Sequence, residues 1–379
     1  MITILSKPPA LILAKQPVSF QVKSNLTPAP SRIVGSVYTI GSDSVQPDAN
    51  KCASFEFSDY LRGLITERYK SDDAPSIYTN LAREITFIFL ELVGSPPVPR
   101  PEIESDPFYL LDGYVPKSRR KSLYSNYSNV LDYLISSKSF LSWWPAEEAK
   151  KVLPDQKEFL NFIQVFSPNP VTLHLRAFLY FTDGSSASYI VPGSVPDVNY
   201  MNVVYFPAGY KQTGLDTYIK SNFSAKTLKA YSLAVMSGAS KVSADQYYMP
   251  DSSYYENSRI LYIRNAFGLL ETFRCTGQAS QVNSFSVETV RTDGRILPEK
   301  VSWKCNKAEV VKADTGFLTA AQMQWLSDMD FLEAYELIGT TLHPIVFHDL
   351  DLSVVHDGVY QYSATLEYEY SATETTEQE

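Results

Sequence analysis

Hydrophobic and polar residues alternate with a period of two over several short runs of this chain. Val18–Val22, Arg83–Val93 and Val171–Phe181 are the clearest of these runs. Successive side chains of a strand point to opposite faces, so this period indicates strands with one buried face and one polar face. The pair Asp183-Gly184 predicts a tight hairpin after the third run, because Asp-Gly suits two-residue turns. The pattern therefore predicts a chain built mainly of short strands.

A helical period of apolar residues occurs in only a few short stretches. Ser58 precedes one of them, which predicts a helix from Asp59 to Arg68 with Ser58 as its cap. Residues 122–139 carry leucines and a valine at near-helical spacing. Thr319 followed by Gln322 has the spacing of a capping box, so a further short helix should begin there. These helices are accessories to the strands.

Breaks in the pattern divide the chain into five parts. We predict a mainly β fold, with two or three β-sandwich-like domains, short helices and a partly helical insertion. The expected parts are a β-sandwich-like domain at 1–95, a Pro-rich linker with the partly helical insertion at 96–155, a second β-sandwich-like domain at 156–250, a β-rich C-terminal domain with a short helix at 251–371, and an acidic disordered tail at 372–379. The pattern leaves open whether the β-rich segments are separate domains.

The amino-acid composition of the chain limits the kinds of partner that it can bind. The chain has 379 residues and a formal net charge of −9, from 33 basic and 42 acidic residues. That balance argues against nucleic-acid binding, which needs a concentrated positive surface. No run of 18 apolar residues exists, and the first twenty residues lack the apolar core of a signal peptide. We therefore expect a product that folds in the cytoplasm, without a signal peptide and without membrane insertion.

Histidines and cysteines are too few and too scattered for an established metal pattern. Three cysteines form neither a disulfide framework nor a zinc motif. One C-terminal stretch does combine possible metal ligands, namely His343, His348, Asp349, Asp351, His356 and Asp357. Strand alternation would send neighbouring members to opposite faces, so a loop or strand-edge role is favoured over a metal site. We predict no catalytic residues, no metal and no cofactor.

Paired aromatic residues are the main candidates for recognition. The pairs are Trp143 with Trp144, Tyr247 with Tyr248, and Tyr254 with Tyr255. Such rings stack on sugars when exposed, but they also cover cores and protein interfaces, and the second interpretation is favoured. They are therefore candidate interface or glycan contacts.

Three segments resemble tail and baseplate structural proteins of bacteriophages and prophages. They are SRILYIRNAFGLLETFRCTGQ at 258–278, FLTAAQMQWLSDMDFLEAYEL at 317–337, and ALILAKQPVSFQVKS at 10–24. The resemblance implies a structural role in a virion assembled in the host cytoplasm. Its partners would be copies of itself in a ring-like homo-oligomer and other tail or baseplate proteins. It supplies no active-site residues.

Three functions remain open at this stage. The first is a structural subunit of a phage-like tail or baseplate, which acts through protein–protein interfaces. The second is a carbohydrate-binding module or receptor-binding adhesin of the same kind of particle, with a surface glycan as partner. The third and least favoured is a cell-envelope glycosidase, which would need two convergent acids such as Asp349 and Asp351.

Overall fold

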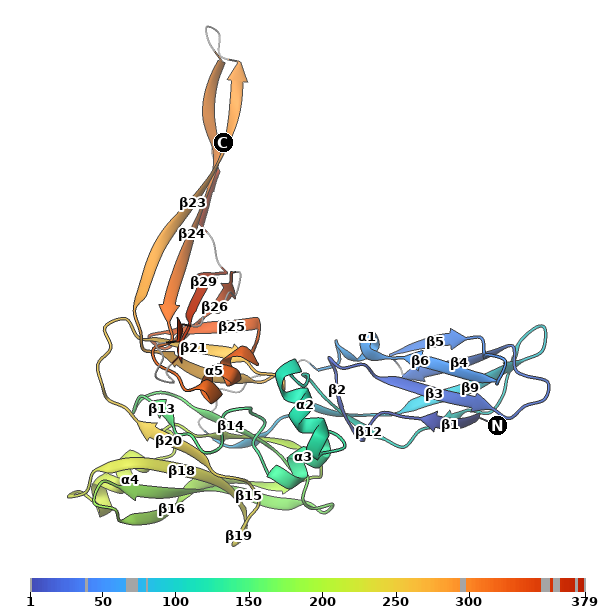
Figure 1. Ribbon diagram of the computed structural model, residues 1–379, viewed down its shortest axis with the longest axis horizontal. Coiled ribbons are helices and arrows are strands. Elements are labelled where there is room, and N and C mark those ends of the chain that lie inside the picture. Colours follow the sequence, from blue (N-terminus) through green and yellow to red (C-terminus); the bar gives the residue numbers. More distant parts are fainter. Residues whose placement is uncertain are drawn as a thin grey trace. The chain divides into compact units, whose positions relative to one another are not determined.

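The computed structural model describes residues 2–37, 40–65, 74–79, 81–293, 298–348, 355–356, 362–371 and 374–377. The fold is mainly β, as the sequence predicts (Figure 1). It divides into two compact units whose segments interleave along the chain. Unit 1 comprises Met1–Ser142, Phe159–Tyr247 and Ala266–Leu269, and unit 2 comprises Trp143–Glu158, Tyr248–Asn265 and Leu270–Glu379. The consecutive parts expected from the sequence therefore do not coincide with these units.

The first part of unit 1 is a β-sandwich. One sheet has the order β1 (Ile2–Ser6), β3 (Ser19–Ser24), β6 (Cys52–Glu56). The other has the order β10 (Val98–Pro99), β9 (Phe87–Val93), β4 (Arg32–Val37), β5 (Gly41–Val45), with β11 (Ile103–Glu104) also paired to β9. The ring of Phe20 in β3 lies 4.5 Å from that of Phe87 in β9, centroid to centroid, and the predicted alternation of Val18–Val22 places its three apolar side chains in this core.

Gly35 in β4 allows the two sheets to pack closely. A Cβ at this position would lie 2.9 Å from Cδ1 of Phe55 and 3.0 Å from Cζ of Phe57. We expect Gly35→Ala to destabilise the sandwich by about 1–3 kcal/mol, because a well-packed core does not accept an added methyl group without shifting its rings. Hydrogen exchange of peptides from β3, β6 and β9 measures this loss. Gly63→Ala is the matched control, since its Cβ would enter open space. Equal protection in the two variants would contradict the prediction.

Two elements of this part differ from the sequence prediction. Residues 83–93 form two strands in different sheets, because β8 (Ala82–Ile85) pairs with β12 (Phe108–Leu111) while β9 pairs with β4. β2 (Leu11–Leu13) completes the sheet of β8 and β12. The helix expected over Asp59–Arg68 is the single turn α1 (Ser58–Leu61), and its residues 66–68 lie outside the described residues. Ser58 does not cap it, because its hydroxyl accepts a hydrogen bond from the backbone N–H of Val18 at 2.9 Å.

The partly helical insertion is confirmed. It contains α2 (Lys117–Asn126) and α3 (Val130–Ser137), and the predicted apolar residues Leu123, Val130 and Leu134 are buried. Asn129 caps α3, since its side chain accepts a hydrogen bond from the backbone of Asp132.

The rest of unit 1 contains two further sheets. One has the order β14 (Phe159–Ile163), β17 (Val203–Pro207), β7 (Ser76–Ile77), and the other contains β15 (Val171–Phe181), β16 (Ser186–Val198), β18 (Leu228–Ser237) and β19 (Ser240–Lys241). The predicted alternation in β15 holds, because the side chains of its four alternating apolar residues are buried. Gly184 turns the chain into β16 with φ +82°, as the Asp183-Gly184 hairpin requires. The helix α4 (Leu215–Asn222) has no counterpart in the sequence prediction.

Unit 2 contains a curled eight-stranded sheet. Its order is β22 (Leu270–Cys275), β21 (Arg259–Arg264), β25 (Asp330–Ile338), β26 (Thr341–Phe347), β29 (Thr365–Tyr370), β24 (Pro298–Asp314), β23 (Ala279–Asp293), with β30 (Glu374–Glu377) also paired to β24. The first and last strands of this order follow one another in the chain. The backbone N–H of Gly277, between them, donates to the carbonyl of Asp314 at 3.1 Å and so extends the β23–β24 pairing toward β22.

The hairpin of β23 and β24 extends beyond the other strands of this sheet (Figure 1). β24 pairs with β29 at Val310–Asp314 and with β30 at Lys304–Lys307. β30 lies in the tail for which the sequence predicts disorder, so part of that tail is a strand in the structure. Its backbone register places Lys304 opposite Glu377 and Lys307 opposite Glu374.

Smaller elements complete unit 2. β13 (Lys150–Val152) pairs in parallel with Tyr248–Pro250 of β20 (Gln246–Pro250), and β27 (Val355–His356) pairs with β28 (Tyr362–Ser363). The capping box is confirmed: α5 (Ala320–Ser327) begins after Thr319, and Gln322 completes the reciprocal hydrogen bonds. Of the helices in the described part of the chain, none is both long enough and apolar enough to span a bilayer.

Candidate functional site

A cavity of about 270 Å³ in unit 2 is lined by buried charged side chains and by Trp144, one of the predicted interface or glycan contacts. Its cationic lining residues are Lys150, Lys151 and Arg274, and its aromatic ones are Trp144, Phe273 and Phe317. Leu318, three threonines and Gln322 complete the lining. None of the described lining residues carries a carboxylate, so the immediate wall of the cavity is positively charged. We refer to it as the β22 pocket, because Phe273 and Arg274 belong to β22.

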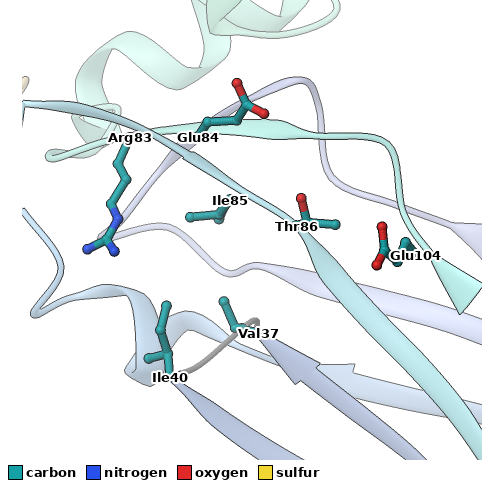
Figure 2. A pocket seen from close by; sticks show the side chains of 7 residues that line it. All are labelled: Val37, Ile40, Arg83, Glu84, Ile85, Thr86 and Glu104. Atoms are coloured by element: carbon teal, nitrogen blue, oxygen red, sulfur yellow. The ribbon is translucent and has the colours of Figure 1, made fainter. Parts of the chain in front are cut away.

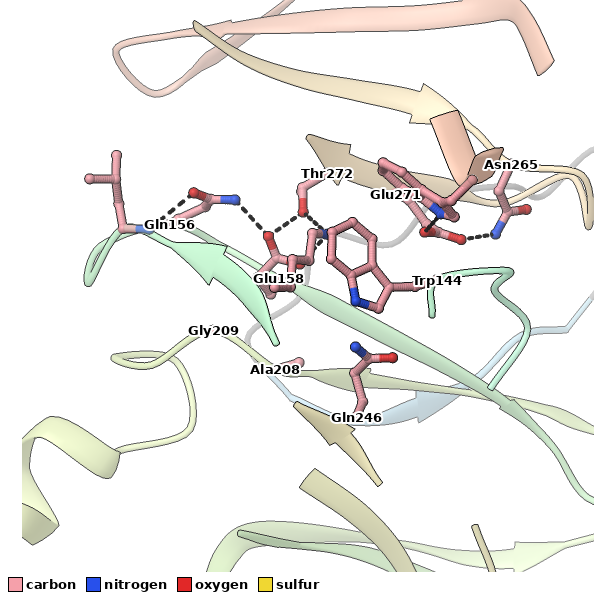
Figure 3. Close-up of polar contacts among 12 residues, drawn as sticks. Trp144, Gln156, Glu158, Ala208, Gly209, Gln246, Asn265, Glu271 and Thr272 are labelled. Atoms are coloured by element: carbon pink, nitrogen blue, oxygen red, sulfur yellow. Dashed lines mark hydrogen bonds and ion pairs between the residues drawn. The ribbon is translucent and has the colours of Figure 1, made fainter. Parts of the chain in front are cut away.

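Lys150 lines the β22 pocket and belongs to a buried polar network with Glu158, Thr272 and Gln156. Figure 3 shows these three partners. Nζ of Lys150 lies 2.8 Å from Oε2 of Glu158 and 2.8 Å from Oγ1 of Thr272. Glu158 also accepts hydrogen bonds from the hydroxyl of Thr272 and from Nε2 of Gln156, the latter at 2.6 Å. The two charges therefore neutralise each other, and the network fixes the side chain of Lys150 in place.

The indole ring of Trp144 lines the β22 pocket and packs against side chains of unit 2. Its ring packs edge-on against Trp325, with 4.8 Å between centroids, and Nζ of Lys150 lies 5.8 Å from its ring centroid. Nε1 of Trp325 donates to Glu271 at 3.0 Å, and Nδ2 of Asn265 donates to the same carboxylate. Figure 3 shows the side chain of Asn265 directed at the carboxylate of Glu271. These contacts hold the indole of Trp144 in one orientation.

Arg274 is the second buried cation of the pocket. Its side chain is 4% exposed, and Tyr255 lies 4.9 Å from its guanidinium carbon, measured to the ring centroid. Its nearest carboxylate oxygen, on Asp251, is 3.7 Å from Nη1, while the carbonyl of Ser253 accepts from Nη2 at 3.2 Å. Burial lowers the pKa of Arg274, and the nearby Asp251 and Tyr255 only partly oppose this shift. Arginine stays charged in proteins, so Arg274 is a buried cation that forms a long ion pair with Asp251.

A separate polar cluster lies in the curled sheet. Oε1 of the buried Glu336 accepts from Arg259 at 2.7 Å, and its Oε2 accepts from the hydroxyls of Tyr368 and Tyr370 at 2.9 and 2.7 Å. Burial, followed by the charge of Glu336, raises the pKa of Tyr368 strongly. Burial likewise raises the pKa of the Cys275 thiol, which makes it a poor nucleophile. This cluster stabilises the sheet and offers no reactive group.

A larger cavity, of about 380 Å³, lies in unit 1 near the junction of β8 and β9 (Figure 2). Its three charged lining residues, Arg83, Glu84 and Glu104, are exposed. Figure 2 shows Arg83 and Glu84 extending in opposite directions. Because it contains neither a buried charge nor a candidate aromatic residue, it is a weaker candidate than the β22 pocket.

The structure disperses the six aromatic candidates. Trp144 lines the β22 pocket, and Tyr255 lies against the Arg274 that lines it. Trp143 and Tyr248 are buried, Tyr247 stacks on Tyr180, and Tyr254 is 86% exposed. The interface and glycan roles of these residues remain predictions.

The remaining candidate residues fall partly outside the described chain. Asp349, Asp351 and Asp357 lie there, as does the side chain of His356. Among the residues that the structure does describe, no three histidines, cysteines or acids form a group that could hold a metal ion. His348 instead lies 3.4 Å from Glu369, between Nε2 and Oε2, and Cys52 and Cys275 are free.

The sequence analysis missed Lys150 and Arg274. Lys150 lies in the charged stretch AEEAKK, which reads as a solvated surface, and its partner Thr272 is 122 positions away. Arg274 stands in the predicted strand before the Cys-Thr-Gly sequence, and only its place beside aromatic neighbours could have marked it. No known family model matches the chain, and no curated protein matches it. The resemblance to tail and baseplate proteins therefore stays a prediction.

Proposed function

We propose that this chain is a structural subunit of a phage-like tail or baseplate, which assembles in the host cytoplasm through protein–protein interfaces. The observation that supports the proposal most directly is the β23–β24 hairpin, with strands of 15 and 17 residues. Its partners would be further copies of the chain, in a ring, and other tail or baseplate proteins.

The hairpin has the properties of an assembly element. Within the described residues, β23 pairs with no strand other than β24, so it is the edge strand of the sheet. An open edge offers unpaired N–H and C=O groups to a strand of another chain. The distal part, beyond Lys304, is a two-stranded ribbon, and such ribbons are at best marginally stable in water. A neighbouring subunit that covers this ribbon would stabilise it, and a head-to-tail repeat of that contact closes a ring.

Native mass spectrometry and negative-stain microscopy test the proposal. At micromolar concentration we expect closed rings whose masses are multiples of 42.6 kDa. A variant in which Asn-Gly replaces residues 289–303 rejoins the directly opposed positions Glu288 and Lys304 through a two-residue turn. We expect this variant to keep its circular dichroism spectrum and to be monomeric.

Two outcomes would contradict the proposal. The first is a wild-type chain that stays monomeric both alone and with co-expressed tail proteins. The second is a truncated variant that still forms the wild-type rings, which would show that the distal ribbon has no part in assembly.

A second candidate function, glycan binding by a receptor-facing adhesin, is favoured by the β22 pocket. Trp144 and the 73% exposed Phe317 give it aromatic faces of the kind that stack on sugar rings. A glycan array probed with the full chain tests this function, and an array without hits would remove it.

A further inference from the structure

We infer that the β22 pocket binds an acidic sugar residue, a pyranose ring that carries a carboxylate, with Arg274 and Lys151 facing the acid and Trp144 and Phe317 facing the ring. This inference rests on the glycan-binding function and adds the class of sugar. It does not depend on the assembly role of the hairpin.

The three cations that line the pocket differ in how closely a carboxylate pairs with them. Lys150 is matched by Glu158 at 2.8 Å, and Arg259, elsewhere in unit 2, by Glu336 at 2.7 Å. Arg274 has its carboxylate at 3.7 Å, and the side chain of Lys151 forms no ion pair in the described part of the chain. The guanidinium of Arg274 donates to Oγ of Ser258 at 3.4 Å and to the backbone carbonyls of Asp251 and Ser253 at 3.4 and 3.2 Å. These hydrogen bonds are longer than those a guanidinium makes to a well-placed carboxylate, which it can bind through two parallel N–H groups. A carboxylate in the pocket would therefore gain more from these two cations than a neutral group would.

The acid is expected on the Arg274 side, away from α5. The N-terminus of α5 already has an acidic neighbour, because Oγ1 of Thr319 donates to both carboxylate oxygens of Glu148 at 2.9 Å. That carboxylate would repel a second anion at the helix end. At Arg274 the nearest acid is Asp251, whose pKa is lowered even though burial acts to raise it. The lowering comes from hydrogen bonds of Ser253 and from the charge of Arg274.

The remaining wall suits a hydroxylated ring. Oε1 of Gln322 accepts a hydrogen bond from the backbone N–H of Thr319 at 3.2 Å. The Nε2 group of Gln322 can therefore donate to a sugar hydroxyl. Trp144 and Phe317 supply apolar ring faces. The cavity volume of about 270 Å³ lies just below the range of roughly 300–1,000 Å³ that is typical of pockets for drug-sized ligands. The occupant is therefore of the size of one sugar residue.

Titration calorimetry with two matched sugars tests the inference on the full chain. Methyl glucuronide and methyl glucoside share a pyranose ring and differ in the carboxylate. We expect the glucuronide to bind at least about tenfold more tightly, as one charge-assisted hydrogen-bond pair provides. Acetate and inorganic phosphate, each titrated alone, should bind more weakly than the glucuronide, because neither has a ring for the aromatic wall.

Three charge-removing variants locate the binding site. Arg274→Gln should weaken glucuronide binding by about tenfold or more and leave glucoside binding unchanged. Lys151→Gln should weaken it about threefold, and because this side chain is exposed, the variant keeps the inference testable if Arg274→Gln does not fold. Lys229→Gln, at an exposed lysine in unit 1, is the matched control and should leave binding unchanged.

The possible results separate the inference from the function on which it rests. Equal affinity for glucoside and glucuronide would overturn the preference for an acidic sugar, while the glycan-binding function would stand. Acetate or phosphate bound as tightly as the glucuronide would overturn the sugar and leave an anion site. Wild-type affinity in folded Arg274→Gln and Lys151→Gln would overturn the assignment to this pocket. If neither sugar binds, and the array also gives no hits, both the inference and the glycan-binding function fail.

Discussion

Lys150→Met is expected to lower the free energy of unfolding of unit 2 by about 3–5 kcal/mol. The wild-type ammonium group lies 2.8 Å from Glu158, and the side chains are 11% and 1% exposed. Methionine fills a similar volume but leaves the buried Glu158 carboxylate without this cation, while Thr272 and Gln156 remain as neutral donors. Removing one partner of a buried ion pair is costly because the other charge stays desolvated.

Tryptophan emission during urea unfolding measures this effect, since all four tryptophans lie within the segments of unit 2. Lys151→Met is the matched control. It changes the neighbouring exposed lysine, and its effect should stay within about 0.5 kcal/mol. The double variant Lys150→Met with Glu158→Leu should recover most of the loss, because it removes both charges. A single variant as mild as Lys151→Met would show that the pair contributes little.

The sequence predicts those parts of the fold that depend on neighbouring residues. The alternation in β15 and the hairpin at Gly184 need only a few consecutive positions, and so does the capping box of Thr319 and Gln322. Period and turn chemistry are local properties, so one sequence is enough to recognise them. The mainly β fold follows from the number of such strands.

The parts that the sequence does not predict depend on distant pairing. Residues 83–93 look like one strand, and only the pairing of Ile85 with Phe108 and of Phe87 with Val37 separates them into two sheets. Likewise, the pairing of β23 with β24 continues to Gly277 through its hydrogen bond to Asp314, a contact that no local pattern marks.

The β22 pocket is predictable only in its aromatic part. Trp144 is a candidate because paired aromatic rings can stack on sugars or cover a protein interface. Lys150 and Arg274 acquire their roles from partners in other segments, Thr272 at 122 positions and Asp251 at 23 positions. Charged residues in a sequence are mostly solvated, so burial is the property that distinguishes these two, and burial is set by the tertiary fold.

Glu336→Leu is expected to destabilise the curled sheet by about 3–5 kcal/mol. The carboxylate is held between β21 and β29 by Arg259, Tyr368 and Tyr370, at distances of 2.7, 2.9 and 2.7 Å. Leucine cannot accept these hydrogen bonds, so a half-buried guanidinium and two hydroxyls lose this acceptor at once. Glu336→Gln retains one acceptor oxygen without the charge, and its loss should be smaller, about 2 kcal/mol.

The midpoint of urea unfolding, followed by tryptophan emission, ranks these variants if the slope of the transition stays constant. Glu333→Leu is the control, because Glu333 lies on the same strand but is half-buried, and its cost should be below about 1 kcal/mol. The order Glu336→Leu, Glu336→Gln, Glu333→Leu, from most to least destabilised, follows only if the charge and the hydrogen bonds of Glu336 both stabilise the sheet. Equal midpoints for the two Glu336 variants would mean that its charge contributes nothing. If Glu336→Leu destabilised the protein no more than Glu333→Leu, water or neighbouring side chains would be replacing the carboxylate. The curled sheet would then depend on its apolar core alone.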